Sequence, residues 1–146
     1  MQAMLYALAV AAGLVLTIQV GVNATLRNAL GNPVMAALMS FLIGLAGLAL
    51  FLIVTRAPLP TKAALFAAPA WAWVGGLLGA FYVATAIVVG PRLGAAALLA
   101  LTVLGQLMAS LVVDHYGWLG FPQHTISVAR LMGAALLFGG VWLIVR

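Results

Sequence analysis

Long uncharged stretches, separated by single charged residues, dominate the pattern of this chain. Four of these stretches exceed the roughly 20 residues that an α-helix needs to cross about 30 Å of hydrocarbon. A fifth, near the C-terminus, reaches that length if Arg130 lies at the membrane surface and extends its charged end into water. The pattern therefore predicts an all-α integral membrane protein with one transmembrane domain, residues 1–146. Its five helices are expected at about 3–27, 33–54, 70–90, 92–113 and 125–145.

Composition supports this prediction. The 146 residues are 67% hydrophobic and 5% charged, and the mean hydropathy is +1.30. A water-soluble domain of this size would need a more polar surface. The segment Met1 to Tyr6 lacks the basic residues of a signal peptide, so we expect the first helix to be retained. The basic residues are scattered, which argues against nucleic acid as a partner and favours membrane lipids.

The connections predict which helices form hairpins. Gly31 suits a left-handed helix end, Asn32 a cap and Pro33 the first position of the next helix, so 3–27 and 33–54 should form a tight hairpin. Gly90-Pro91-Arg92 predicts a second tight turn. Residues 63–69 are expected along the membrane surface, ahead of tryptophans that suit an interfacial aromatic belt.

Small residues recur at four-residue spacing within the predicted helices. Such spacing lets helices approach closely in lipid, where no hydrophobic force drives them together. We expect contact faces, within or between subunits, at Ser40 and Gly44, Gly75 and Gly79, Ala129 and Gly133, and Ala135 and Gly139.

Polar residues form a stripe on each of two predicted helices. One stripe contains Gln19, Asn23 and Arg27, and the other contains Thr102, Gln106, Ser110 and Asp114. Residues four apart share a helix face, and exposing these groups to lipid would cost a few kcal/mol each. Hydrogen bonds between helices would satisfy them at about 1 kcal/mol per bond. Two stripes in so apolar a chain favour a polar cavity.

The basic residues are balanced between the two sides of the membrane. Arg56, Lys62 and Arg130 would lie on one side, and Arg27, Arg92 and Arg146 on the other. An excess of Lys and Arg normally sets orientation during insertion, and three against three leaves none. The count favours insertion in both orientations and an antiparallel homodimer, although charge near the first helix could still select one topology.

Several motifs of the chain are typical of a known family. They are Gln19-Val-Gly-Val-Asn23, Leu26-Arg27-Asn-Ala-Leu-Gly31-Asn-Pro33, Ser40-Phe41, Pro91-Arg92-Leu-Gly94, Gly105-Gln106 and Asp114-His115-Tyr-Gly117-Trp-Leu-Gly120. The chain resembles the YdcZ-like family of small bacterial inner-membrane proteins in the drug/metabolite transporter superfamily. The resemblance implies a five-helix unit that pairs with an inverted copy to form a ten-helix transporter. Family members can be fused, paired or single dual-topology genes, and the balanced charge favours the last kind.

From these observations we expect a secondary transporter that moves an unknown small-molecule substrate by alternating access. Gln19, Asn23, Gln106 and Ser110 are predicted to bind the substrate between two inverted subunits. Arg27, Asp114 and His115 are candidates for gating or coupling. The alternative is a structural or accessory membrane subunit that does not transport.

Catalysis and cofactors are not expected. One side-chain carboxyl and two histidines are few groups for acid–base or nucleophilic catalysis. Cysteine is absent, and Asp114, His115 and His124 lack the tight spacing of metal ligands. The small multidrug exporters of the superfamily bind protons and cations through a membrane-embedded Glu, which this chain lacks. Asp114 is therefore the one side-chain carboxyl available for proton coupling, with an ion pair to Arg130 or a loop cap as the alternatives.

Overall fold

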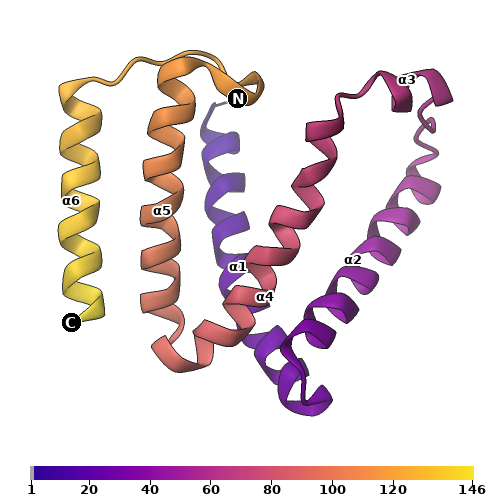
Figure 1. The fold of residues 1–146 in the computed structure, drawn as a ribbon, viewed down its shortest axis with the longest axis horizontal. Helices are drawn as coiled ribbons and strands as arrows, with labels where there is room; N and C mark the ends of the chain where they lie inside the picture. Colours follow the sequence, from indigo (N-terminus) through magenta and orange to yellow (C-terminus); the bar gives the residue numbers. More distant parts are fainter. Residues whose placement is uncertain (1) are drawn as a thin grey trace. The chain divides into compact units, whose positions relative to one another are not determined.

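The computed structural model describes residues 2–146, and no strand occurs in that range. Figure 1 shows the helices in chain order. They are α1 (Gln2–Leu30), α2 (Pro33–Thr55), α3 (Lys62–Ala67), the 3₁₀ helix η1 (Ala70–Val74), α4 (Gly75–Leu93), α5 (Ala95–Tyr116), the 3₁₀ helix η2 (Trp118–Gly120) and α6 (Val128–Val145). Five helical segments are long and apolar enough to cross a membrane, which confirms the predicted number: α1, α2, η1 with α4, α5 and α6.

The chain divides into two compact units, Met1–Arg92 and Leu93–Arg146. The first contains α1 to α4, and the second contains α5 and α6. Each is described by itself below.

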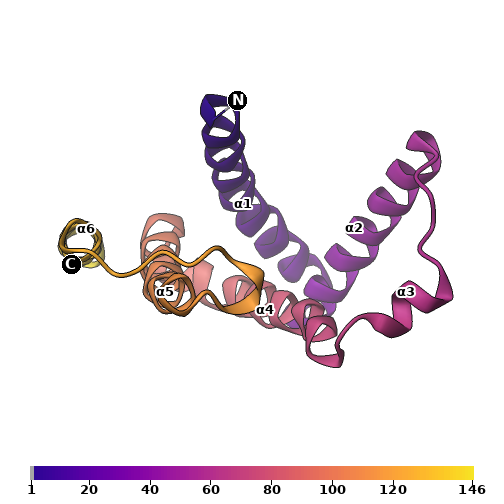
Figure 2. The ribbon, with the colours of Figure 1, turned by 90° about the horizontal axis from the view of Figure 1, so that it is seen from above.

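The predicted hairpin between the first two helices is confirmed. Gly31 has a φ of +70°, which glycine adopts without strain. The Asn32 side-chain oxygen accepts hydrogen bonds from the backbone N–H groups of Val34 and Met35, at 2.8 and 3.1 Å. Pro33 opens α2. From this hairpin α1 and α2 diverge, as the view in Figure 2 shows.

The predicted turn at Gly90-Pro91-Arg92 is wrong. Helix α4 continues through Pro91 to Leu93, and the left-handed residue is Gly94, with a φ of +82°. Pro91 has no N–H, so the carbonyl of Ile87, four residues earlier, loses its helical donor. Nη1 of Arg27 in α1 donates to that carbonyl at 3.3 Å. A side chain from another helix therefore compensates for the proline.

The core of the first unit lies between α2 and α4. Ala36 and Ala37 pack with Val83 and Ile87, and Leu26 of α1 covers the cluster. This contact places α1, α2 and α4 together near the hairpin.

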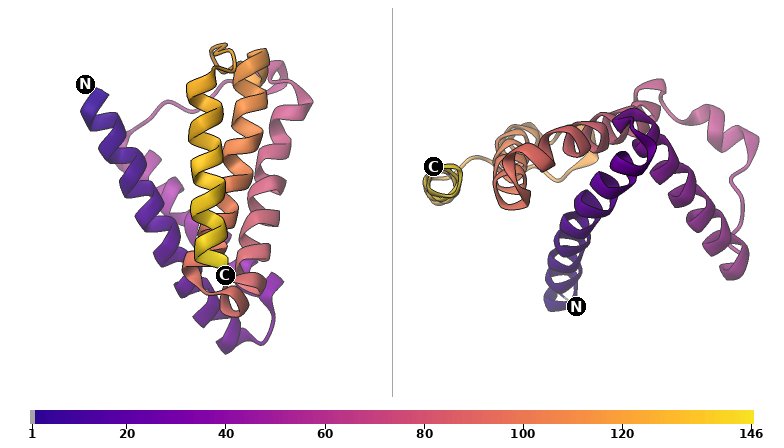
Figure 3. Two further views of the ribbon diagram at one scale, coloured as in Figure 1. Left: turned by 90° about the vertical axis from the view of Figure 1, so that its left-hand side faces the viewer. Right: turned by 90° about the horizontal axis from the view of Figure 1, so that it is seen from below.

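The second unit is a pair of helices joined by the loop 117–127. Helices α5 and α6 lie side by side, which Figure 3 shows from two directions. Gly117, with a φ of +65°, ends α5, and the Ser127 side chain caps α6 by accepting from the N–H of Arg130 at 3.3 Å. Helix-capping residues therefore stand at both ends of the loop.

Candidate functional site

A cavity of about 350 Å³ lies between α1 and α2. Its lining residues are Gln19, Ser40, Phe41, Gly44, Leu45 and Leu48. Gln19 is a predicted substrate-binding residue, whereas Ser40 and Gly44 were predicted as helix-packing residues. The structure brings these three together around a space, so α1 and α2 are not in close contact at this level.

Asn23 lies one helical turn beyond Gln19 and is only 4% exposed. Its polar neighbours in α1, Thr17 and Thr25, donate to backbone carbonyls of their own helix. Asn23 is the one polar residue that is buried among residues 2–146. A buried amide is unfavourable in apolar surroundings unless it is hydrogen-bonded. This side chain is therefore the strongest candidate ligand group in the first unit.

Tyr82 is a polar residue of α4 that the sequence analysis missed. It packs against the Ala36–Ile87 cluster, and its buried hydroxyl has no hydrogen-bond partner among residues 2–146. Tyrosine was counted as apolar in the hydrophobic pattern, which is why its hydroxyl escaped notice. A tyrosine in the middle of an apolar span was the available signal.

In the second unit, a cavity of about 430 Å³ lies between α5 and α6. It is lined by Leu107, Ser110, Leu111, Asp114, Arg130, Gly133 and Ala134. The structure thus brings a predicted substrate ligand, Ser110, beside a predicted coupling residue, Asp114. Gln106 is exposed on α5, one turn before Ser110.

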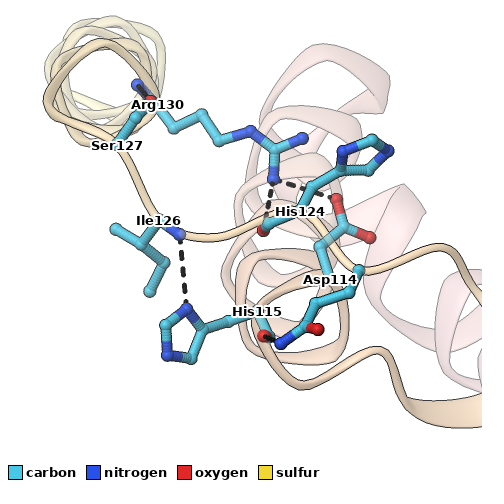
Figure 4. A network of polar contacts seen from close by, with 7 residues as sticks. Asp114, His115, His124, Ile126, Ser127 and Arg130 are labelled. Atoms are coloured by element: carbon cyan, nitrogen blue, oxygen red, sulfur yellow. Dashed lines mark hydrogen bonds and ion pairs between the residues drawn. The ribbon is translucent and has the colours of Figure 1, made fainter.

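Asp114 forms an ion pair with Arg130, at 3.1 Å between Oδ2 and Nη1 (Figure 4). The same nitrogen donates to the carbonyl of His124 at 3.3 Å, and the N–H of His124 donates to the Asp114 carbonyl at 2.8 Å. The ion pair was one of the alternatives for Asp114, and the structure confirms it. The side chains are 35% (Arg130) and 26% (Asp114) exposed, so solvent limits the pair to about 1 kcal/mol or less. A coupling role for Asp114 stays a prediction.

His115, the next residue of α5, also forms hydrogen bonds with the loop 117–127 (Figure 4). Its Nδ1 accepts from the N–H of Ile126 at 3.3 Å, and its carbonyl accepts from Nε2 of Gln123 at 2.9 Å. In the structure His115 therefore stabilises the conformation of this loop. Its coupling role stays a prediction.

The predicted helix-packing glycines differ in their surroundings. A Cβ added at Gly79 would lie 3.7 Å from the Phe41 ring of α2, so this glycine is at a helix contact within the first unit. Among the described residues, nothing lies within 4 Å of a Cβ added at Gly44, Gly75, Gly133 or Gly139. Contact between subunits at those four positions stays a prediction.

The predicted substrate ligands fall into the two units, Gln19 and Asn23 in the first and Gln106 and Ser110 in the second. Each unit presents a cavity with at least one of these side chains on its wall. That all four residues line one central cavity stays a prediction.

Comparison with known proteins identifies the family. A family model described as "Putative inner membrane exporter, YdcZ" matches residues 4–143. The chain belongs to this family. Together with the five apolar helices, that membership makes this YdcZ-family chain a multi-pass inner-membrane protein. The resemblance carried by the sequence motifs is confirmed.

One curated relative of this YdcZ-family chain is the inner membrane protein YdcZ of Escherichia coli (strain K12). The two are 36% identical over 76 residues, which cover 52% of this chain and 50% of the relative. The matched segment therefore spans about half the length of that protein. No solved structure matches the chain.

Proposed function

We propose that this chain is a secondary transporter that exports a small molecule by alternating access, as an antiparallel homodimer in the inner membrane. The family description as an exporter supports a transport role. The observation that carries the proposal is the burial of Asn23, a polar residue of an apolar helix that is only 4% exposed. A transported molecule with hydrogen-bonding groups would satisfy the Asn23 amide.

The cavity beside Gln19 extends this argument. Asn23 and Gln19 are one turn apart on α1, and the cavity between α1 and α2 is lined mainly by apolar side chains. Binding sites for small molecules combine an apolar wall with a few polar groups that set orientation. In the proposed dimer, Gln106 and Ser110 of α5 complete the site, and symmetry supplies two copies of each residue.

The second candidate is a structural or accessory subunit. Such a role accounts for five apolar helices and open small-residue faces. It assigns no purpose to the buried amide of Asn23, where an apolar residue would avoid the cost of burying a polar group. The two functions therefore differ in what happens when Asn23 is truncated.

The test is transport by the purified protein in liposomes. A library of cationic, neutral and anionic compounds is screened for thermal stabilisation of the protein, and each stabilising compound is then measured for efflux. Asn23→Ala should bind such a compound about five- to tenfold more weakly, the value of one hydrogen bond, and should transport it more slowly. Thr25→Ala is the matched control, since Thr25 is exposed and its hydroxyl donates to the Gly21 carbonyl of the same helix.

Three results would count against the proposal. One is efflux by Asn23→Ala equal to that of the parent, and another is equal loss in Thr25→Ala. The third is a parent protein that folds, binds no compound and moves none, which would favour the accessory subunit.

A further inference from the structure

The segment between α2 and α4 contains a groove that none of the proposed transport steps uses. It has a volume of about 560 Å³ and is lined by Lys62, Leu65, Phe66 and Trp73. Lys62, Leu65 and Phe66 belong to α3 at spacings of three and four, so they share one face of that short helix. Trp73 comes from η1, which follows the extended residues Ala68 and Pro69. Local structure alone therefore builds the groove, inside the first unit.

The lining of the groove is amphiphilic. Phe66 is 87% exposed and Trp73 is 60% exposed, so most of their ring surface is not covered by the chain. Figure 1 shows α3 at the same end of the first unit as the end of α2 and the start of α4. Both neighbours are membrane-spanning helices, so the groove lies at a membrane surface. Trp73 suits this position, because its indole N–H can reach the headgroups while its ring lies in lipid. Phe66 adds apolar area for an acyl chain.

The charge of Lys62 has no acidic counterpart in this chain. The sequence has a single acidic residue, Asp114, and its carboxylate pairs with Arg130. A negative group for the Lys62 ammonium must therefore come from outside the chain. At a membrane surface, the available anions with an apolar portion are anionic phospholipids, which attract each nearby Lys or Arg by about 1 kcal/mol.

We propose that the groove of Lys62, Leu65, Phe66 and Trp73 binds one anionic phospholipid. The lipid phosphate lies against the Lys62 ammonium, and an acyl chain runs over Phe66 and Trp73. Neither half of the site suffices alone, because the cation would bind any anion and the rings any lipid. The combination selects a molecule with both features. This site does not depend on the transport function, since α3 and η1 contain none of the predicted substrate ligands.

Binding is measured with the full chain in nanodiscs of phosphatidylcholine to which phosphatidylglycerol is added. The readout is the number of phosphatidylglycerol molecules retained on the protein in native mass spectrometry, together with quenching of tryptophan fluorescence by brominated phosphatidylglycerol. The parent should prefer phosphatidylglycerol, and excess inorganic phosphate should not displace it. Lys62→Gln should weaken phosphatidylglycerol binding about fivefold, whereas Lys62→Arg should retain it.

Arg56→Gln is the matched control. It removes one positive charge from the same connection, six residues earlier, without touching the groove. We expect less than a twofold effect for Arg56→Gln. Because the chain has four tryptophans, quenching is measured in a variant that keeps Trp73 and has Phe at the other three positions, and Lys62→Gln in that background should reduce it. Phe66→Ser should weaken binding of both lipids while leaving the spanning helices intact.

Equal losses in Lys62→Gln and Arg56→Gln would mean that only the diffuse surface charge matters and would overturn the site. Displacement of the lipid by inorganic phosphate, or no preference of the parent for phosphatidylglycerol, would also overturn it.

Discussion

Arg27 has a structural role in the first unit that the sequence motif did not predict. It was a candidate for gating, since a cation on a polar stripe of a spanning helix is costly unless it has a partner. In the structure its guanidinium donates to the Ile87 carbonyl, the group that Pro91 leaves without a helical donor. Ile87 is fully buried, so water cannot take the place of that donor. Arg27 thus stabilises α4 as a continuous helix through Pro91.

This role predicts a coupled pair of substitutions. Arg27→Ala should lower the free energy of unfolding by about 1–3 kcal/mol, because the Ile87 carbonyl becomes a buried, unpaired acceptor. In a Pro91→Ala background the new N–H of residue 91 can donate to that carbonyl, so Arg27→Ala should cost much less. The free energies come from denaturant unfolding of the four proteins in detergent. Arg92→Ala controls for loss of a basic charge near the same helix end. Equal costs of Arg27→Ala in both backgrounds would contradict this role.

At the scale of elements, small-residue spacing identified helix faces but not what they meet. Gly79 of α4 contacts Phe41 of α2, while Gly75, one turn earlier, has no neighbour within 4 Å among the described residues. The two glycines are four positions apart and were predicted to lie on the same contact face. Gly79 therefore lies at a helix contact inside the subunit, whereas Gly75 is open in it.

The two glycines should respond differently to bulky substitution. Gly79→Leu places a branched side chain against the Phe41 ring and should destabilise the fold by about 1–3 kcal/mol. Gly79→Ala should be mild, since its Cβ would make an ordinary contact at 3.7 Å. Gly75→Leu should leave the unfolding of the isolated subunit unchanged and weaken only the dimer. Thermal melting and light scattering after size-exclusion chromatography separate the two effects. A Gly75→Leu subunit that melts as low as Gly79→Leu would place Gly75 in the same contact.

At the scale of the whole molecule, the balance of basic residues determines how the chain should insert. With five spanning helices, the sequence predicts three Lys or Arg residues on each side of the membrane, so we expect no charge preference during insertion. Both orientations must coexist for the proposed antiparallel dimer to form. Topology is therefore the property on which the ten-helix assembly depends.

Cysteine labelling tests that topology directly, because the chain contains no cysteine. Leu59 is 80% exposed in the connection between α2 and α3, so Leu59→Cys should react with a membrane-impermeant maleimide from both sides of the membrane. Adding Lys at positions 57 and 63 to this variant should favour one orientation, with the loop in the cytoplasm. The parent, which has no thiol, controls for background. Labelling of Leu59→Cys from a single side would rule out dual topology.

Features set by short segments were predictable from the sequence alone. Helix length and hydropathy are properties of one segment, so the number of spanning helices needed no knowledge of packing. The same holds for the turn at Gly31, Asn32 and Pro33, where a backbone conformation and a cap are chosen within a few residues. The motifs that carry the family resemblance are likewise contiguous.

Features that depend on distances between segments were decided only by the tertiary structure. The helix through Pro91 depends on Arg27, which donates to the carbonyl of Ile87, 60 positions further along the chain, and no local pattern reveals that contact. Asn23 and Arg27 share a polar stripe, yet Asn23 is buried and Arg27 is partly exposed and hydrogen-bonded to α4. For Asp114, the sequence allowed both an ion pair and a proton-coupling role, and folding of the loop placed Arg130 within 3.1 Å. A polar residue in an apolar helix must be satisfied, but what satisfies it depends on which neighbour the fold brings within hydrogen-bonding distance.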